Sequence, residues 1–156
     1  MQQPIVAAAI VMAAALGANV YNSVVDAPNW GAAIPNSTKI MREYFATANP
    51  GTLDRVLGPL TQILALAALV TCWRRYPDAR GPLGLALGGM VIADMRTFGF
   101  FYPRNAIMMS DQSNIEALRA AWHEWSAVNH VRSAAVLVAS VAELTALARI
   151  ASLAPR

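Results

Sequence analysis

Four long stretches of the chain are almost entirely apolar and are separated by more polar segments. They cover about residues 4–26, 54–73, 81–103 and 129–153. Each is close to the roughly 20 apolar residues that an α-helix needs to cross the hydrocarbon core of a bilayer. The pattern therefore predicts an all-α fold, a bundle of four transmembrane helices that forms one integral membrane domain over residues 1–156.

The first stretch has a competing interpretation as a cleaved signal peptide. No charged residue occurs in residues 1–25. A signal peptide usually begins with positive charge and ends at a small-x-small cleavage site, and this segment has neither feature. We therefore expect the first stretch to be retained as a spanning helix.

An amphipathic segment, residues 37–48, lies in the loop after the first span. Its residues Ile40, Met41, Tyr44 and Phe45 share one helical face, and charged residues occupy the other face. This pattern predicts a short helix that lies on the membrane surface.

The last helix is predicted to be long, because no Pro or Gly interrupts the chain from Asn114 until Pro155. A helix of about 40 residues at 1.5 Å per residue is about 60 Å long, which exceeds the thickness of a bilayer. Its first third should therefore project from the membrane or bend along it.

The composition agrees with lipid as the solvent. Of the 156 residues, 56% are hydrophobic and 13% are charged, and the mean hydropathy is +0.41. An ordinary soluble domain has about 25% charged residues. Cys72 is the only cysteine, so an intrachain disulfide and a thiolate-cage metal site are excluded, and its apolar neighbours predict a buried thiol.

The net charge of +3 does not indicate a nucleic-acid partner, because the basic residues form no run longer than Arg74-Arg75. They are densest in the short loop between the second and third spans, which also holds Arg80. Loops rich in Arg and Lys stay in the cytoplasm, and four spans place both termini on one side. We expect both termini in the cytoplasm, with a bacterial inner membrane as the location.

Polar residues recur on one face of the fourth span. The positions repeat at intervals of three and four, which places them along a single seam of a helix. They are Trp125, Asn129, Arg132, Val136, Ser140 and Glu143. Ionisable groups are costly in hydrocarbon, so this seam is expected to face the bundle interior.

Further polar residues lie at the same predicted depth in the outer half of the bundle. Asn22 and Asp26 lie at the outer end of the first span, and Asp94 lies in the third span. We expect these three residues to converge with Asn129, His130 and Arg132, and Asp26 or Asp94 to pair with Arg132. The alternative is an ion-pair network that only fixes helix register. Glu143 is expected nearer the cytoplasmic end, where Arg149 or the Arg74-Arg75 pair would reach it.

Aromatic residues are expected to line a small pocket beside these polar residues. They are Phe98, Phe101, Tyr102, Trp122 and Trp125. Such a lining suits a small hydrophobic or aromatic molecule that arrives from the surrounding membrane lipid.

His123 and His130, the two histidines, lie about 10 Å apart along a helix and cannot hold one metal ion together. No metal and no cofactor is predicted. Alternatives for His130 are a proton acceptor, an axial ligand of haem b, or a histidine hydrogen-bonded within the polar seam.

Four short motifs mark the ends of the spans. They are Gly-Ala-Asn-Val-Tyr at residues 17–21, Ala-Pro-Asn-Trp at 27–30, Arg-Val-Leu-Gly-Pro at 55–59, and Trp125-x-x-x-Asn129-x-x-Arg132. In this order, over nearly the whole chain, they resemble the anthrone-oxygenase-like family of small four-span membrane proteins. The resemblance implies an oxygenase that needs no obvious metal or flavin and oxidises an activated aromatic CH₂ group to a carbonyl. It carries over Trp125, Asn129 and Arg132.

Two functions are consistent with these features. In the first, a membrane enzyme acts on a small hydrophobic substrate by proton abstraction with oxidation or isomerisation. Asp94 or His130 would remove the proton, Asn129 and Arg132 would hold the enolate, and Asn22, Asp26, Phe98, Tyr102, Trp122 and Trp125 would contact the substrate. In the second, a noncatalytic membrane subunit or small-solute carrier uses the seam to bind a partner or ion. Small residues on the first and third spans, including Gly84-x-x-x-Gly88, also predict a homo-oligomer.

Overall fold

The computed structural model describes residues 3–110 and 114–153, and the regular elements in that part of the chain are all helices. Four helical rods are long and apolar enough to cross a membrane, which confirms the predicted four-span all-α bundle. The rods cover Gln3–Gly31, Pro50–Cys72, Pro77–Met109 and Ile115–Ser152.

The rods consist of the following elements. The first contains α1 (Gln3–Tyr21), a π-helical turn (Asn22–Asp26) and α2 (Ala27–Gly31), and the second is α4 (Pro50–Cys72). The third contains a 3₁₀ turn (Pro77–Ala79), α5 (Arg80–Arg96), a second π-helical turn (Thr97–Phe101) and α6 (Tyr102–Met109). The fourth is α7 (Ile115–Ser152), and the predicted short helix of the first loop is α3 (Asn36–Tyr44).

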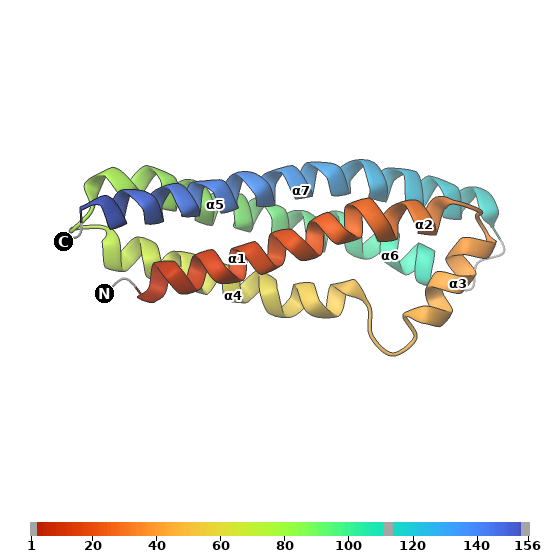
Figure 1. Ribbon diagram of the computed structural model, residues 1–156. Helices are drawn as coiled ribbons and strands as arrows, with labels where there is room; N and C mark the ends of the chain where they lie inside the picture. Colours follow the sequence, from red (N-terminus) through yellow and green to blue (C-terminus); the bar gives the residue numbers. More distant parts are fainter. Residues whose placement is uncertain (1–2, 111–113, 154–156) are drawn as a thin grey trace.

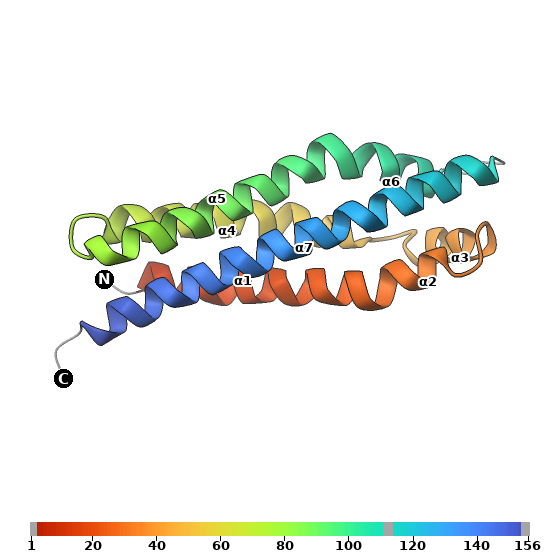
Figure 2. The same ribbon diagram turned by 90° about the horizontal axis from the view of Figure 1, so that it is seen from above.

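Both chain ends lie at one end of the bundle, and α3 lies at the opposite end (Figure 1). We call these the terminal end and the distal end. Helix α7 runs the whole length of the molecule beside α5 and α1, as Figures 1 and 2 show. The N-terminal part of α7 packs against α2 and α6, so the long last helix also forms part of the distal end.

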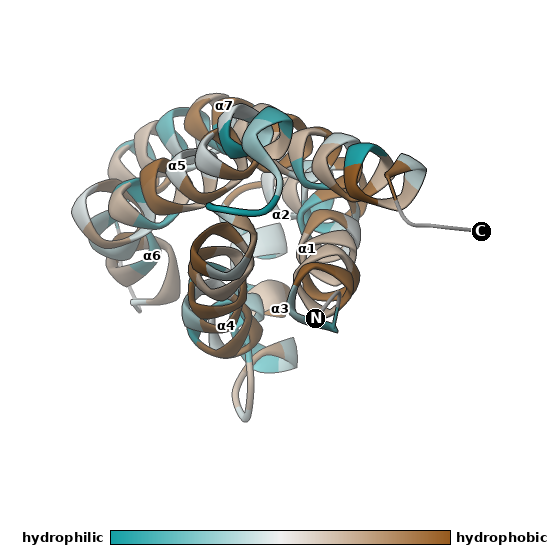
Figure 3. Ribbon diagram, turned by 90° about the vertical axis from the view of Figure 1, so that its left-hand side faces the viewer, coloured by the Kyte–Doolittle hydropathy of each residue, from teal (hydrophilic) through white to brown (hydrophobic). Residues whose placement is uncertain are grey.

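Large aliphatic side chains are exposed on the outer faces of all four rods. They include Ile10, Ile63, Val70, Ile92, Val141 and Leu144. Figure 3 shows apolar residues on most sides of α4. An exterior this apolar suits lipid and not water, because every spanning helix must present hydrocarbon-compatible side chains to acyl chains. The chain is an integral membrane protein.

The interior of the bundle is packed with small apolar side chains. One cluster near the terminal end contains Ile5, Ala8, Ala68, Cys72, Ala79, Leu83, Ala146 and Ile150, and confirms that the Cys72 thiol is buried. A middle cluster contains Met12, Ala65, Ala86, Met90, Ala93, Val136, Ala139 and Ala142. Because alanine allows backbones to approach closely, these helices associate largely through van der Waals contact.

The two π-helical turns change which residues face inward. Along the first rod, and apart from Ala9, the buried residues from Ile5 to Asn22 are spaced alternately by three and four positions, but the next buried residue is Ala27, five positions later. The backbone N–H of Ala27 bonds the carbonyl of Asn22, and that of Tyr102 bonds Thr97 in the same way. Each turn precedes a proline at the second position of the following helix, Pro28 or Pro103. Proline has no N–H and crowds the preceding turn, so a wider turn here is consistent with its presence.

Gly89 lies at a close contact between α5 and α7. A Cβ atom at this position would lie 3.0 Å from the Cβ atom of Ala139. We predict that Gly89→Leu forces the two helices apart and lowers the free energy of unfolding by about 1–3 kcal/mol. Thermal unfolding in detergent measures the loss.

The matched control for this prediction is Gly17→Leu on α1, because nothing lies within 4 Å of a Cβ atom built at Gly17. The control should unfold close to the wild-type temperature. Equal losses in both variants would show that the contact of Gly89 with α7 is not what the larger side chain disturbs.

Candidate functional site

The side chain of Arg132 lies at the centre of the distal half and contacts all three other spans. It is 7% exposed. Its Nε donates to Asn19 Oδ1 at 2.9 Å on the first rod, and Nη2 lies 3.3 Å from Asp54 Oδ2 at the start of α4. Nη1 makes a long contact of 3.5 Å with Thr97 Oγ1 on the third rod. The buried charge therefore has an acidic partner and further hydrogen-bond acceptors, as such a charge requires.

A second set of hydrogen bonds surrounds Asn129, one helical turn from Arg132. Asn129 Nδ2 donates to Ser23 Oγ at 2.9 Å and approaches Asn22 Oδ1 at 3.5 Å. Asn22 Nδ2 in turn contacts Asp26 Oδ2 at 3.4 Å. The first rod and α7 are thus joined by a row of amide and hydroxyl groups that leads from Arg132 toward Asp26.

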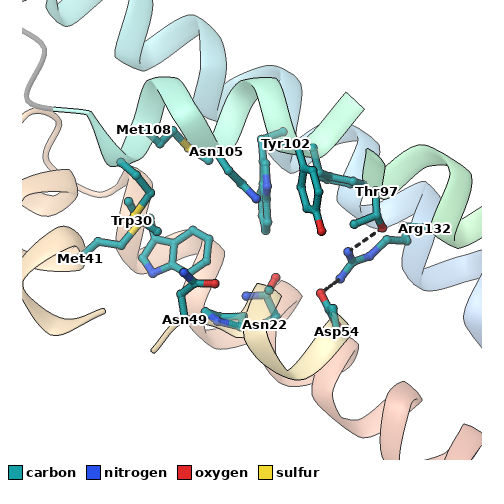
Figure 4. Close-up of a pocket in the computed structure, with 15 residues that line it drawn as sticks. Asn22, Trp30, Met41, Asn49, Asp54, Thr97, Tyr102, Asn105, Met108 and Arg132 are labelled. Carbon is teal, nitrogen blue, oxygen red and sulfur yellow. Dashed lines mark hydrogen bonds and ion pairs between the residues drawn. The ribbon is translucent and has the colours of Figure 1, made fainter. Parts of the chain in front are cut away.

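A partly open space, which we call the inner chamber, lies beside Arg132 (Figure 4). Its walls combine amide, aromatic and thioether side chains. They include Asn22, Trp30, Met41, Asn49, Asp54, Thr97, Phe101, Tyr102, Asn105, Met108, Trp125 and Arg132. The chamber has about 40 Å³ of room for water-sized molecules, which is enough for about three waters at 10–15 Å³ each.

A larger hollow, the side pocket, adjoins the inner chamber. The two spaces share Asn22, Asn49, Pro50, Asp54 and Arg132 as lining residues. The side pocket has a volume of about 360 Å³ and also touches Tyr21, Asp26, Tyr44, Phe45 and Leu53. A third hollow of about 350 Å³ beside α3 shares Asp26, Tyr44 and Phe45 with it. Ligand sites typically measure 300–1,000 Å³, so the side pocket has room for a small molecule.

A further hollow of about 530 Å³ lies elsewhere and is unsuited to polar chemistry. It is an apolar groove on the outside of α5 and α7, lined by Pro82, Leu85, Leu137, Val138, Val141, Ala142 and Thr145. No ionisable side chain lines it. Its position on the exterior of two spanning helices is where lipid chains would lie.

The structure brings together most of the residues that the sequence assigned to the site. All six residues of the polar seam on α7 are buried, so the seam faces the interior as predicted. Arg132, Trp125, Asn22 and Tyr102 line the inner chamber, and Asp26 lines the side pocket. Asn129 supports this wall through its bonds to Ser23 and Asn22.

Two predicted site residues are exposed and lie outside the cavities. His130 is exposed, because it follows Asn129 by one position and one position rotates a helical side chain by about 100°. A haem ligated by His130 would lie against the outer surface of the bundle. Phe98 is 62% exposed and stacks on Tyr102 at a ring distance of 5.3 Å. It lies within the second π-helical turn, where the inward register shifts to Phe101.

Trp122 and Asp94, two further predicted site residues, form hydrogen bonds between helices and do not line the cavities. Trp122 Nε1 donates to the carbonyl of Ala27 at 2.9 Å, and its ring lies against Gly31, where a Cβ atom would overlap it. Asp94 accepts a short hydrogen bond from Gln62 Nε2 across the contact between α4 and α5. Both residues join helices and are absent from the linings of the inner chamber and the side pocket.

The acidic partner of Arg132 is Asp54, and the prediction of Asp26 or Asp94 was wrong. The helix of the second span begins at Pro50, so Asp54 lies within its first two turns and reaches Arg132. The sequence did carry a signal for this start, since Asn49 caps the helix and Pro50 occupies its first position. The lining residues Asn49, Thr97 and Asn105 were also missed, and no motif marked them.

The predicted pairing of Glu143 with an arginine is also wrong. Its two carboxylate oxygens have no hydrogen-bond partner among the described residues. Arg149 Nη1 donates to the backbone carbonyl of Asp78 at 2.6 Å instead.

Comparison of the chain with protein-family models, with curated proteins and with solved structures finds no match. The resemblance to the anthrone-oxygenase-like family therefore rests on the sequence motifs alone.

Removal of the charge on Asp54 should destabilise the bundle, because Arg132, which is only 7% exposed, would lose its counter-charge. We predict that Asp54→Asn lowers the free energy of unfolding by about 1–3 kcal/mol, measured by unfolding in detergent. The control Glu124→Gln removes the exposed ion pair with Arg104, which measures 2.8 Å, and should cost less than about 1 kcal/mol. Equal costs would contradict a structural role for the Arg132–Asp54 pair.

Proposed function

We propose that this chain is a membrane enzyme that removes a proton from a small hydrophobic molecule bound in the side pocket. The observation that carries the proposal is the side pocket itself, where the Arg132 guanidinium and the Asp26 carboxylate line one hollow of about 360 Å³. Asp26 has Asn22 as its hydrogen-bond partner and no cationic partner among the described residues. A carboxylate without a cationic partner is available to accept a proton.

The chemistry suits a substrate with a CH₂ group next to a carbonyl. Asp26 would take one hydrogen as a proton, and the electron pair of the broken C–H bond would move onto the carbonyl oxygen. The resulting enolate oxygen would be stabilised by Arg132 and Asn22, since both present N–H donors beside the pocket. This assignment places Asp26 in the role that the sequence gave to Asp94 or His130.

Two outcomes are open to such an enolate. Return of the proton to a different carbon gives isomerisation. The family resemblance favours oxidation by dioxygen, in which the CH₂ group becomes a carbonyl with one oxygen atom and the second oxygen atom leaves with both hydrogens as water. An aromatic substrate would suit this pocket, because its rings could pack against the side chains of Tyr21, Tyr44 and Phe45 in the wall.

Anthrone, an enolisable aromatic ketone, provides the test. We predict that wild-type protein in detergent accelerates exchange of the anthrone CH₂ hydrogens in heavy water, followed by nuclear magnetic resonance. Asp26→Asn should reduce the catalysed rate by about 10²–10⁴-fold, because the proton acceptor is lost. Asp78→Asn, which neutralises an exposed acid at the terminal end, is the matched control and should retain the wild-type rate.

Three other results would count against this mechanism. A normal rate in Asp26→Asn would exclude Asp26 as the base, and a loss in His130→Ala would favour the exposed histidine. Binding of anthrone without any catalysed exchange would support the noncatalytic carrier. Unfolding temperatures of each variant separate a loss of activity from a loss of fold.

We further propose that the protein lies in a bacterial inner membrane with both termini in the cytoplasm. In support, Arg74, Arg75 and Arg80 lie in and beside the connection between α4 and α5, at the same end as the termini (Figure 1). The distal cavities would then open toward the opposite side. A reporter enzyme that is active only in the cytoplasm should be active when fused to the C-terminus, and inactivity would reverse the orientation.

Self-association is also proposed. Gly84 and Gly88 lie one turn apart on α5, and nothing lies within 4 Å of a Cβ atom built at either position. Small residues open to the surroundings allow the backbone of a second helix to approach closely.

A further inference from the structure

Glu143 on α7 is a second membrane-level acid, nearer the terminal end, and the proposed chemistry does not use it. Its exposure is 0%, and neither Oε1 nor Oε2 has a hydrogen-bond partner among the described residues. Of the Asp, Glu, Lys, Arg and His residues in the described part of the chain, the other buried one is Arg132, which has three partners. Glu143 is therefore the buried acidic or basic residue for which the fold provides no hydrogen-bond partner and no counter-charge.

The surroundings of Glu143 are apolar. Ala139 lies one turn before it on the same face of α7 and belongs to the middle apolar cluster. Ala146 lies one turn after it and belongs to the cluster near the terminal end. The carboxyl group is thus placed between two clusters that consist mainly of alanine, leucine, isoleucine and methionine side chains.

The helices that pack around Glu143 place no charged side chain beside it among the described residues. Residues 3–20 of α1 and 81–93 of α5, the two helices that contact α7 most, contain no ionisable side chain. On α4 the ionisable residue nearest this level is Cys72, a thiol in the cluster near the terminal end. On α7 itself Arg149 donates to the carbonyl of Asp78.

We propose that Glu143 is a proton-binding site within the membrane. A carboxylate with no donor and no cation beside it is strongly disfavoured in such surroundings, whereas a carboxylic acid that holds a proton carries no net charge. Release of the proton would leave an unpaired charge between two apolar clusters. Proton exchange therefore requires α7 to separate from α1 and α5 far enough to admit water.

This inference does not rest on the proposed function, because Glu143 is about three turns of α7 away from Arg132 and lines none of the distal cavities. Binding and turnover in the side pocket can be present or absent whatever the state of Glu143. The two proposals are tested by separate measurements.

Infrared spectroscopy of the detergent-solubilised full chain tests the proton site directly. At neutral pH the wild-type protein should show the C=O stretching band of a protonated carboxylic acid, and Glu143→Gln should lack the part of that band due to Glu143. Glu116→Gln is the matched control, because Glu116 is an exposed glutamate at the start of the same helix. The control should retain the full wild-type band.

An unchanged band in Glu143→Gln would show that Glu143 is ionised in the folded protein and would overturn the proposal. If Glu143→Gln fails to fold, Glu143→Leu, which fills a similar volume without a polar group, gives the same comparison. Loss of the band in either variant supports the site.

Discussion

The burial of one positive charge constrains the arrangement of the whole bundle. The guanidinium of Arg132 has five N–H donors, and the residue is only 7% exposed, so protein groups must supply most of its hydrogen-bond acceptors. Asn19, Asp54 and Thr97 satisfy it, one from each of the other three spans. Each helix must therefore adopt the rotation that presents its acceptor, which fixes the mutual orientation of helices that otherwise associate through small, interchangeable alanine contacts.

The same constraint explains where chemistry is possible. A guanidinium held from three sides has little freedom to reorient, and Arg132 lines both the inner chamber and the side pocket. In surroundings of low polarity, such fixed donors stabilise developing negative charge more strongly than mobile donors in water. The acidic and amide side chains that share the pocket are positioned by the same network, so the distal half combines structural and chemical roles in a few residues.

The regular parts of the fold were predictable from sequence, and the irregular parts were not. The seam on α7 was found because an uninterrupted helix keeps its three-and-four spacing from Trp125 to Glu143. Phe98 was misplaced because a π-helical turn shifts the register, and a proline shortly after it was the available signal. Asp54 was missed as a partner because its helix begins one turn earlier than its hydrophobic stretch. In both cases the hydrophobic pattern predicted that a helix was present. Which polar side chains meet depended on the residue at which the helix starts or on the π-helical turn within it.

The two wider turns have a further consequence for how this protein can vary. Each adds one residue to a helical rod without lengthening any loop, and so turns everything beyond it by about 100° about the rod axis. Deletion of one residue from Asn22–Asp26 would swing Trp30 out of the aromatic cluster that it forms with Phe45 and Trp125. The rotation of the distal residues about each rod axis is therefore set independently of the packing of the two apolar clusters. A one-residue insertion or deletion at a π-helical turn would change which side chains line the distal cavities and would leave those clusters unchanged.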